Sequence, residues 1–177
     1  AEVRPQDCEG RTDFRGELTV TIDGDDARDF DDAVSVERRD AGGFTLRVHI
    51  ADVSHYVQAG SALDGDARDR GTSVYFPDRA VHMFPADLAT GLCSLKPRVD
   101  RLVQSCVVDL DAGGEPTRVG FCDGVIRSHA RLTYTGVNAV LTGQPVPGDP
   151  IDAPVAAMLR EMHALFRLLR DRRRRRR

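Results

Sequence analysis

The sequence lacks the long hydrophobic segments that a membrane span or a secretory signal needs. No window approaches the ~20 consecutive apolar residues of a transmembrane helix, and the N-terminal stretch has no apolar signal core. At 177 residues with 41% hydrophobic content, the chain is nevertheless long enough to bury a core. We therefore expect one globular domain that is cytoplasmic and has no membrane partner.

The cysteines lack the paired spacing that zinc sites require. They form no CxxC pair and no Cys/His pair at ligand spacing, and three lie in or beside apolar stretches. We expect buried, reduced thiols at Cys8, Cys93, Cys106 and Cys122. The histidines are also scattered, and no chemistry is assigned to His49, His55, His82, His129 and His163.

Positive charge is scarce outside the C-terminal end. The formal net charge is −3, but six positive charges belong to the arginine run at 172–177, which leaves −9 on the rest. This acidic body excludes nucleic-acid binding by net charge alone, because neutralising phosphates requires a basic surface. The arginine run fits two interpretations, a nucleic-acid tail or the solvated end of a helix.

A first hairpin is predicted where apolar and polar residues alternate. Residues 18–23 read as a half-buried strand that ends at Asp23, and a second strand begins at 34–36. The turn Asp-Ala-Gly-Gly at 40–43 leads into strict alternation over 44–50, which is typical of an antiparallel hairpin.

A second hairpin is predicted further along the chain. The string Asp-Ala-Gly-Gly recurs at 111–114, between apolar runs at 102–110 and 117–126. The flanking sequences differ, so the recurrence indicates shared turn chemistry rather than an internal repeat.

Helices are predicted at 61–70, where Ser61 is a candidate N-cap, and at 134–141. The clearest helix follows Pro154, a proline that a first turn tolerates. Its apolar residues recur at helical spacing and are expected to face the core; they are Val155, Met158, Leu159, Met162, Leu165, Phe166 and Leu169. No glycine or asparagine caps this helix, so we expect the chain to be cut within a longer protein.

One short loop holds six aspartates. Residues 23–32 read DGDDARDFDD and lie between two predicted strands, with Phe30 as an apolar anchor among the charges. Such a loop could simply be solvated and mobile. Carboxylates held close together instead favour shared protons or a bound cation, because neighbouring like charges resist joint ionisation. Hard oxygen ligands indicate magnesium or manganese.

Two familiar acidic motifs do not fit this loop. An EF-hand that starts at Asp23 would need an oxygen ligand at its fifth position and glycine at its sixth, where Ala27 and Arg28 stand. The haloacid dehalogenase pattern requires Gly-Thr after its second aspartate, whereas Asp26 and Ala27 follow Asp25.

A third pattern fits. The segment TIDGDDARDFDDA at 21–33 resembles the signature of the ribonuclease II/ribonuclease R family of exoribonucleases, and its details are closer to the ribonuclease R branch. Further blocks resemble the family in the family's order: IADVSHYV at 50–57, GSALD at 60–64, GTSVYFP at 71–77, GLCSL at 91–95, and Pro97 with VDRL at 99–102. The resemblance covers about residues 11–170.

The resemblance implies both a fold and a reaction. The fold is an α/β (α+β) domain with a mixed β-sheet and packed helices. The reaction is 3′-to-5′ hydrolysis of single-stranded RNA to nucleoside 5′-monophosphates by a monomeric enzyme that uses two Mg²⁺ ions, or Mn²⁺.

The resemblance also assigns site residues. Four family aspartates that hold the metal ions fall on Asp23, Asp29, Asp31 and Asp32, so Asp25 and Asp26 are not the first choice as ligands. On an extended segment Asp29 and Asp31 point to one side and Phe30 to the other, while Asp32 needs a local bend to join them.

Two tyrosines are assigned to RNA binding. The resemblance implies that Tyr75 stacks on a base near the 3′ end, although packing beside Phe76 is the alternative. Tyr134 aligns with a nucleotide-contacting region, with packing again as the alternative.

The resemblance further divides the chain into a lead-in at 1–16 and part of the catalytic domain at 17–177. The family's cold-shock and S1 OB-fold domains, its catalytic arginine and its second aromatic clamp have no counterpart here. Two other readings remain, namely a non-catalytic RNA-binding relative and an acidic metal-binding module unrelated to RNA.

Overall fold

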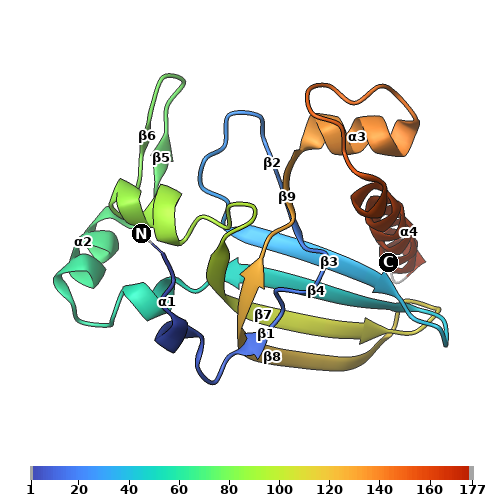
Figure 1. Ribbon diagram of the computed structural model, residues 1–177, viewed down its shortest axis with the longest axis horizontal. Coiled ribbons are helices and arrows are strands. Elements are labelled where there is room, and N and C mark those ends of the chain that lie inside the picture. Colours follow the sequence, from blue (N-terminus) through green and yellow to red (C-terminus); the bar gives the residue numbers. More distant parts are fainter. Residues whose placement is uncertain (1, 176–177) are drawn as a thin grey trace.

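The computed structural model describes residues 2–175, and a seven-stranded sheet forms its centre (Figure 1). The strands of this sheet are β1 (Thr12–Asp13), β2 (Val20–Asp23), β3 (Asp32–Arg38), β4 (Phe44–Ala51), β7 (Asp100–Leu110), β8 (Pro116–Arg127) and β9 (Ala130–Thr133). A separate hairpin consists of β5 (Val74–Tyr75) and β6 (Ala80–Val81). The helices are α1 (Val53–Tyr56), α2 (Ala62–Arg70), α3 (Tyr134–Thr142) and α4 (Ala153–Arg175), with short turns of 3-10 type at Pro5–Cys8 and of π type at Leu88–Leu92.

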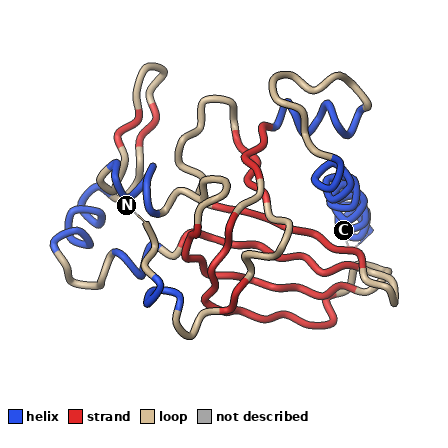
Figure 2. The backbone as a smooth tube through the Cα atoms, in the orientation of Figure 1, coloured by secondary structure: helices blue, strands red, loops and turns tan. Residues whose placement is uncertain are grey.

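The sheet is mixed, as predicted. Its order is β1-β8-β7-β4-β3-β2-β9, and neighbouring strands are antiparallel except for the pairs β1/β8 and β2/β9. The tube view shows the helices grouped at the two ends of this sheet (Figure 2). Both predicted hairpins are present, because β3 pairs with β4 and β7 pairs with β8.

The two Asp-Ala-Gly-Gly turns lie side by side, since β4 pairs with β7 along its whole length. Gly43 has a φ of 84°, and a Cβ atom there would come within 2.1 Å of the carbonyl oxygen of Leu110. Only glycine adopts this positive φ without strain and has no Cβ atom to clash with that oxygen.

The predicted helices are present, with one error in the apolar stripe. Ser61 caps α2 by accepting a hydrogen bond from the backbone of Asp64 (3.2 Å). In α4, Val155, Met158, Leu159 and Leu165 are buried as expected. Phe166 is 53% exposed, because a residue next to Leu165 lies 100° further round the helix.

The helix α4 packs on one face of the sheet. Val155 and Leu159 contact Val20 and Leu132 there, and Leu165 packs against Phe44. A second core on the opposite face contains Phe14, Phe30, Leu95, Val103 and Ile126. No helix among residues 2–175 is both long and apolar enough to cross a membrane.

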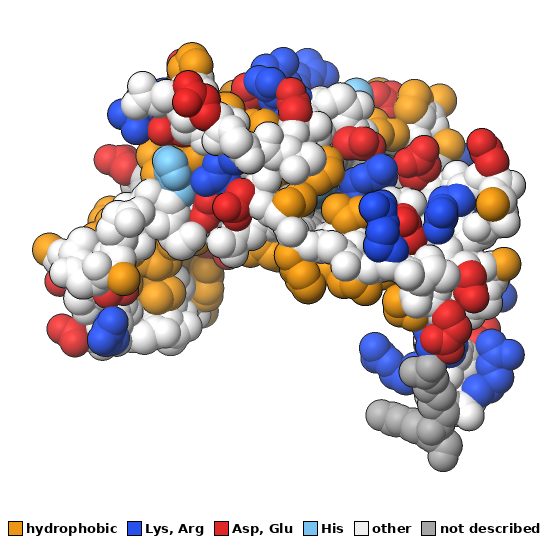
Figure 3. All heavy atoms as spheres, turned by 90° about the horizontal axis from the view of Figure 1, so that it is seen from below, with side chains coloured by type: hydrophobic (Ala, Val, Ile, Leu, Met, Phe, Trp, Pro, Cys, Tyr) orange, Lys and Arg blue, Asp and Glu red, His pale blue; other side chains and the backbone are white. Residues whose placement is uncertain are grey.

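The α4 helix covers only one end of its face. Phe44 and Ile50 share this face because they are an even number of residues apart on β4, yet Ile50 is 48% exposed and Phe121 on β8 is 81% exposed. The space-filling view shows a hollow bordered by hydrophobic side chains beside the C-terminal part of α4 (Figure 3).

The cysteines are free, but the prediction that they are buried is correct only for Cys93. Cys106 is half-buried because it lies on the α4 face of β7, beyond the end of that face that α4 covers. Cys122 on β8 lies on the opposite face, where it packs at the border of the core that contains Phe14. Cys8 is half-buried in the short N-terminal turn.

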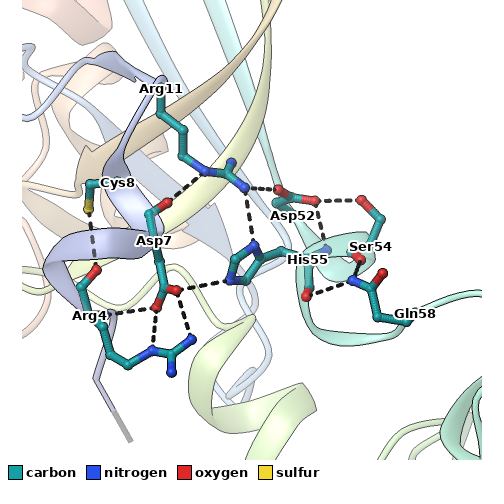
Figure 4. A network of polar contacts seen from close by, with 8 residues as sticks. All are labelled: Arg4, Asp7, Cys8, Arg11, Asp52, Ser54, His55 and Gln58. Carbon is teal, nitrogen blue, oxygen red and sulfur yellow. Dashed lines mark hydrogen bonds and ion pairs between the residues drawn. The ribbon is translucent and has the colours of Figure 1, made fainter.

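Polar contacts tie the N-terminal segment to α1 (Figure 4). Arg11 donates to Oδ2 of Asp52 (2.6 Å) and to the backbone oxygen of Asp7 (3.0 Å). Asp52 in turn caps α1 by accepting from the backbone of His55 (3.2 Å) and the hydroxyl of Ser54 (2.7 Å). With β1 in the sheet and Phe14 in the core, part of the predicted lead-in at 1–16 belongs to the folded unit.

Candidate metal centre in the aspartate loop

The aspartate-rich segment connects β2 to β3 and rises beside the β5–β6 hairpin (Figure 1). Asp23 is the last residue of β2 and Asp32 is the first residue of β3. Because these strands are antiparallel neighbours, the sheet fixes both ends of the loop.

Phe30 anchors the middle of the loop, as predicted. Its side chain is buried, its backbone nitrogen donates to Oγ of Ser94 (3.1 Å), and its backbone oxygen accepts from Leu95 (2.8 Å). The Ser94 hydroxyl also donates to the backbone oxygen of Arg28 (3.0 Å). These bonds fix the backbone between Asp29 and Asp31.

Arg101 holds the segment that carries Ser94. Its buried guanidinium donates to the backbone oxygens of Ser94 (2.8 Å), Gly91 (3.2 Å) and Asp100 (2.9 Å). Burial lowers the pKa of Arg101, since a charged group is costly in the core. The blocks at 91–95 and 99–102 therefore serve as a support for the aspartate loop.

Arg131 on β9 clamps the first half of the loop. It donates to the backbone oxygens of Gly24 (2.6 Å) and Asp25 (2.8 Å), and its guanidinium carbon lies 5.5 Å from the centre of the Phe30 ring. No local pattern indicates this role of Arg131, because it depends on the pairing of β2 with β9.

Three of the four predicted metal ligands line one cleft. Asp23, Asp29 and Asp31 lie in a cavity of about 810 Å³ beside Tyr75 and His82. Burial, followed by the charges of Asp32 and Asp29, raises the pKa of Asp23, although Arg131 opposes this. Asp32 itself is exposed at the start of β3 and is not part of the cavity lining.

The pKa of Asp31 is raised as well. Burial is the largest cause, followed by the charges of Asp29, Asp32 and Asp23. The charges of Asp29 and Asp32 therefore act on both Asp23 and Asp31 and oppose the ionisation of these two carboxyl groups. A cation bound among them would remove this penalty.

The donor atoms fit a hard divalent cation in kind, but they do not converge on one point. Oδ2 of Asp23 is buried without a hydrogen-bond partner among the described residues, and four carboxylates suit Mg²⁺ or Mn²⁺. Within residues 2–175, however, no three Asp, Glu, His or Cys side chains meet closely enough to hold an ion. Joint coordination would require at least one carboxylate to rotate.

Tyr75 contacts one of these carboxylates directly. The side chain is 63% exposed on the β5–β6 hairpin, and its hydroxyl donates to Oδ2 of Asp29 (2.5 Å). This hydrogen bond raises the pKa of Tyr75. This exposure disfavours the alternative packing role for Tyr75, and the predicted stacking on RNA stays a prediction.

His82 is a site residue that the sequence did not indicate. Its Nδ1 lies 3.8 Å from Oδ2 of Asp29, and its ring meets that of Tyr75 edge to face with centroids 6.2 Å apart. The β5–β6 hairpin brings it there, so no ligand spacing in the sequence could have revealed it.

Tyr134 lies at the same edge of the sheet but outside the cleft lining. It follows Thr133, which pairs with Asp23 in the parallel β2/β9 pair, and its side chain is 65% exposed. This exposure disfavours a packing role, and the predicted RNA contact stays a prediction.

A partly basic rim borders the acidic cleft. Arg28, Phe76 and Arg79 line its mouth, and the guanidinium carbon of Arg79 lies 4.8 Å from the centre of the Phe76 ring. Such groups suit a ligand that is both anionic and aromatic.

An acidic, cation-compatible cleft on a mixed sheet, bordered by exposed aromatic residues and arginines, is the kind of site found in metal-dependent nucleases. The model of the RNB domain matches residues 11–177, and the chain belongs to this family. The resemblance deduced from the motifs is thereby confirmed.

The relatives are similar over most of this chain. Ribonuclease R of Escherichia coli is 48% identical over 168 residues, which is 95% of this chain and 20% of the relative. Ribonuclease R of Thermotoga maritima is 50% identical over 141 residues, 80% of this chain and 20% of the relative. The chain thus spans about a fifth of the length of these relatives.

Solved structures agree. Mycoplasma genitalium RNase R in complex with double-stranded RNA matches with a TM-score of 0.93 at 30% identity, covering 99% of this chain and 31% of that one. Yeast Ssd1, described as a pseudonuclease, matches with a TM-score of 0.79 at 22% identity over 97% of this chain and 20% of that one, which shows the fold alone.

Proposed function

We propose that this chain carries the metal-binding part of a 3′-to-5′ exoribonuclease that hydrolyses single-stranded RNA to nucleoside 5′-monophosphates. The observation that carries the proposal is the crowding of four aspartates, Asp23, Asp29, Asp31 and Asp32, beside an exposed tyrosine, where burial and the neighbouring negative charges raise the pKa of Asp23 and Asp31. The relatives named ribonuclease R support the choice of RNA as substrate. A monomeric state and a location in the cytoplasm stay predictions.

The four aspartates would hold Mg²⁺ or Mn²⁺. A pair of such ions, when bound, activates a water molecule, orients the phosphate and stabilises the leaving 3′ oxygen. The protein's own contribution is to keep the carboxylates in place, through Phe30, Ser94 and Arg131. No covalent intermediate with a protein side chain is needed.

Other residues of the cleft would position the RNA. Tyr75 offers an exposed ring on which any base can stack, because every base has a π face. Arg28 and Arg79 at the mouth would contact phosphates, since guanidinium groups match phosphate oxygens in geometry. Extended single strands suit such a cleft because their bases are free to stack on protein rings.

A non-catalytic RNA-binding relative is the rival reading. The four aspartates favour the enzyme, because binding alone would not require carboxylates to be crowded against one another near an anionic ligand. A bound metal ion resolves this repulsion, so metal binding separates the two readings.

The test is a manganese titration by calorimetry, with wild type compared with Asp31→Asn. Asp25→Asn is the matched control, since it removes one carboxylate from the same loop outside the cleft lining. We expect Asp31→Asn alone to weaken metal binding by about tenfold or more. In the full-length protein the same variant should nearly abolish hydrolysis of single-stranded RNA in a gel assay while leaving RNA binding close to normal. Retained hydrolysis would refute the proposed function.

A further inference from the structure

The outer face of α4 is basic and carries an exposed aromatic residue. Its buried Leu165 and half-buried Leu168 and Leu169 pack toward the sheet. Residues at spacings of three and four share the opposite face of the helix. We call these residues the α4 outer face: Arg160, His163, Phe166, Arg167, Arg170 and Arg174, all of them exposed.

The arginines of this face are largely unpaired. Arg160, Arg167 and Arg174 make no side-chain hydrogen bond or ion pair within residues 2–175, and Arg170 has only its neighbour Asp171 at 3.7 Å. Elsewhere, arginines such as Arg15, Arg47 and Arg127 are paired with carboxylates. Arg28, Arg39 and Arg98 are also without such a partner among residues 2–175, but they lie on three separate segments, whereas α4 gathers several unpaired guanidinium groups on one helix in a chain whose remainder is acidic.

Arg172 shows that the helix end is held in place. Its guanidinium contacts the carbonyl oxygen of Gly114 and the carboxylate of Glu115 in the β7–β8 turn. Arg172 thus points toward the protein, while Arg170 and Arg174 point away from it. The last turns of α4 are fixed against the sheet, so the α4 outer face is a defined surface rather than a loose tail.

Phe166 gives this surface a second property. Its ring is 53% exposed, the guanidinium carbon of Arg170 lies 5.4 Å from the ring centre, and the His163 ring is 6.1 Å away at 38°. A solvated helix face needs no aromatic residue, since exposing one costs free energy. An aromatic ring among unpaired arginines is the combination that single-stranded nucleic acid requires, with a ring for bases and cations for phosphates.

We propose that the α4 outer face is a second binding surface for single-stranded RNA, separate from the aspartate cleft. The proposal rests on the proposed function for its choice of RNA. From Arg160 to Arg174 the helix extends about 21 Å at ~1.5 Å per residue, the length of about six nucleotides of a single strand whose bases are stacked at ~3.4 Å. Here the free arginines bind phosphates, and Phe166 stacks with one base.

Two sets of variants distinguish RNA binding by the α4 outer face from a general effect of net charge. The test set is Arg167→Gln/Arg170→Gln/Arg174→Gln, and the matched control is Arg68→Gln/Arg98→Gln/Arg118→Gln, three exposed arginines outside α4 that remove the same charge. Phe166→Ala is matched by Phe121→Ala, which removes a ring on β8 that is more exposed still, at 81% against 53%. All of these side chains are exposed, and circular dichroism checks that each variant is folded.

The measurement is fluorescence anisotropy of a labelled 20-nucleotide oligouridylate with EDTA present, at several salt concentrations. We expect the α4 triple variant to weaken binding about tenfold and to lower the salt slope by about 2, because each lost phosphate contact on a single strand contributes ~0.7. Phe166→Ala should weaken binding about fivefold. Both control variants should stay within about twofold of wild type.

Three results would overturn the proposal. Equal losses in both triple variants would show an effect of net charge alone, and unchanged binding by the α4 variants would show a merely solvated helix. Equal affinity for an acidic peptide of the same length would indicate a protein partner instead. Because EDTA removes divalent ions, this test is independent of hydrolysis, and the proposed function can fail without affecting it.

Discussion

The hydroxyl of Tyr75 donates a 2.5 Å hydrogen bond to Oδ2 of Asp29. Tyr75 is the residue predicted to stack on RNA, and Asp29 is a predicted metal ligand. Oδ2 of Asp29 therefore cannot give its full lone-pair capacity to a cation while the hydroxyl occupies it. Metal binding and the position of Tyr75 are coupled through this one oxygen atom.

Two substitutions separate the ring of Tyr75 from its hydroxyl. Tyr75→Phe removes the hydrogen bond and keeps the ring, so manganese should bind about threefold to tenfold more tightly, given ~1 kcal/mol for an exposed hydrogen bond. Tyr75→Ala should change the size of the final oligonucleotide in the full-length enzyme, because an unclamped 3′ end is released earlier. Calorimetry measures the first effect and a product ladder on a gel the second. An unchanged ladder with Tyr75→Ala would end the stacking assignment.

The crowded carboxylates predict an unusual pH dependence of the metal-free protein. The pKa of Asp31 is raised by burial and by its negative neighbours, so the folded state binds this proton more tightly than the unfolded state does. The resulting stability is present at low pH and is lost as pH rises through the folded pKa. The asparagine in Asp31→Asn cannot ionise, so this variant does not lose that stability as pH rises.

We therefore expect Asp31→Asn to be more stable than wild type at about pH 7 and equal to it at about pH 3. The increase in Tm should be only about 1 to 2 °C, since Asp31 is exposed and solvent screens its charge. Thermal unfolding followed by circular dichroism in EDTA measures the difference across this pH range. A lower Tm for Asp31→Asn at neutral pH would contradict the strain inferred among the aspartates.

Ser94 offers a test of how the loop is supported. Ser94→Ala removes the bonds to the Phe30 nitrogen and the Arg28 oxygen, at a cost of about 1 to 3 kcal/mol for buried groups left unpaired. For a chain of this size, Tm should fall by about 2 to 4 °C per kcal/mol, and manganese binding should weaken. Ser35→Ala is the control, because the Oγ of this buried serine has no partner among the described residues. That variant should be neutral or slightly stabilising, and an equal loss in both would remove the special role of Ser94.

Local sequence patterns predicted most of the fold and part of the site. Alternation over 44–50 predicted β4 because the two faces of a strand differ in burial, and Ser61 predicted the start of α2 because a hydroxyl there satisfies a backbone donor. Phe30 was predicted to anchor the loop for the same local reason. The placement of Phe166 was wrong, since hydrophobicity alone does not show whether a ring faces core or solvent.

The parts of the site that the sequence did not predict depend on contacts between distant segments. Ser94 reaches the aspartate loop across 64 residues of sequence, Arg131 across 107, and His82 reaches Asp29 through a small hairpin. No spacing rule links such pairs, because the sheet and not the local chain brings them together. Arg101 was in a matched block, but only the structure shows that it supports Ser94.

The last prediction concerns the buried ion pair between Arg11 and Asp52 (Figure 4). Burial alone would raise the pKa of Asp52, but hydrogen bonds from Ser54 and Arg11 outweigh it and the pKa is lowered. A lowered carboxyl pKa stabilises the fold above the unfolded value, and this stability is lost as pH falls through the folded pKa. Asp52→Asn should therefore cost about 1.5 to 3 kcal/mol at neutral pH, since the Arg11 charge loses its partner. The gap from wild type should narrow below about pH 4.

Urea unfolding at several pH values measures this gap. A double-mutant cycle with Arg11→Met and Asp52→Asn isolates the pair itself, and we expect a coupling energy of at least ~1 kcal/mol. The control is Arg68→Met with Asp64→Asn, an i,i+4 pair on α2 whose arginine side chain is 78% exposed, for which ~0.3 to 0.5 kcal/mol is expected. Equal coupling in the two pairs would show that burial adds nothing to the Arg11–Asp52 contact. A larger coupling energy between Arg11 and Asp52 would show that this pair fixes the N-terminal segment, and with it β1, to the domain.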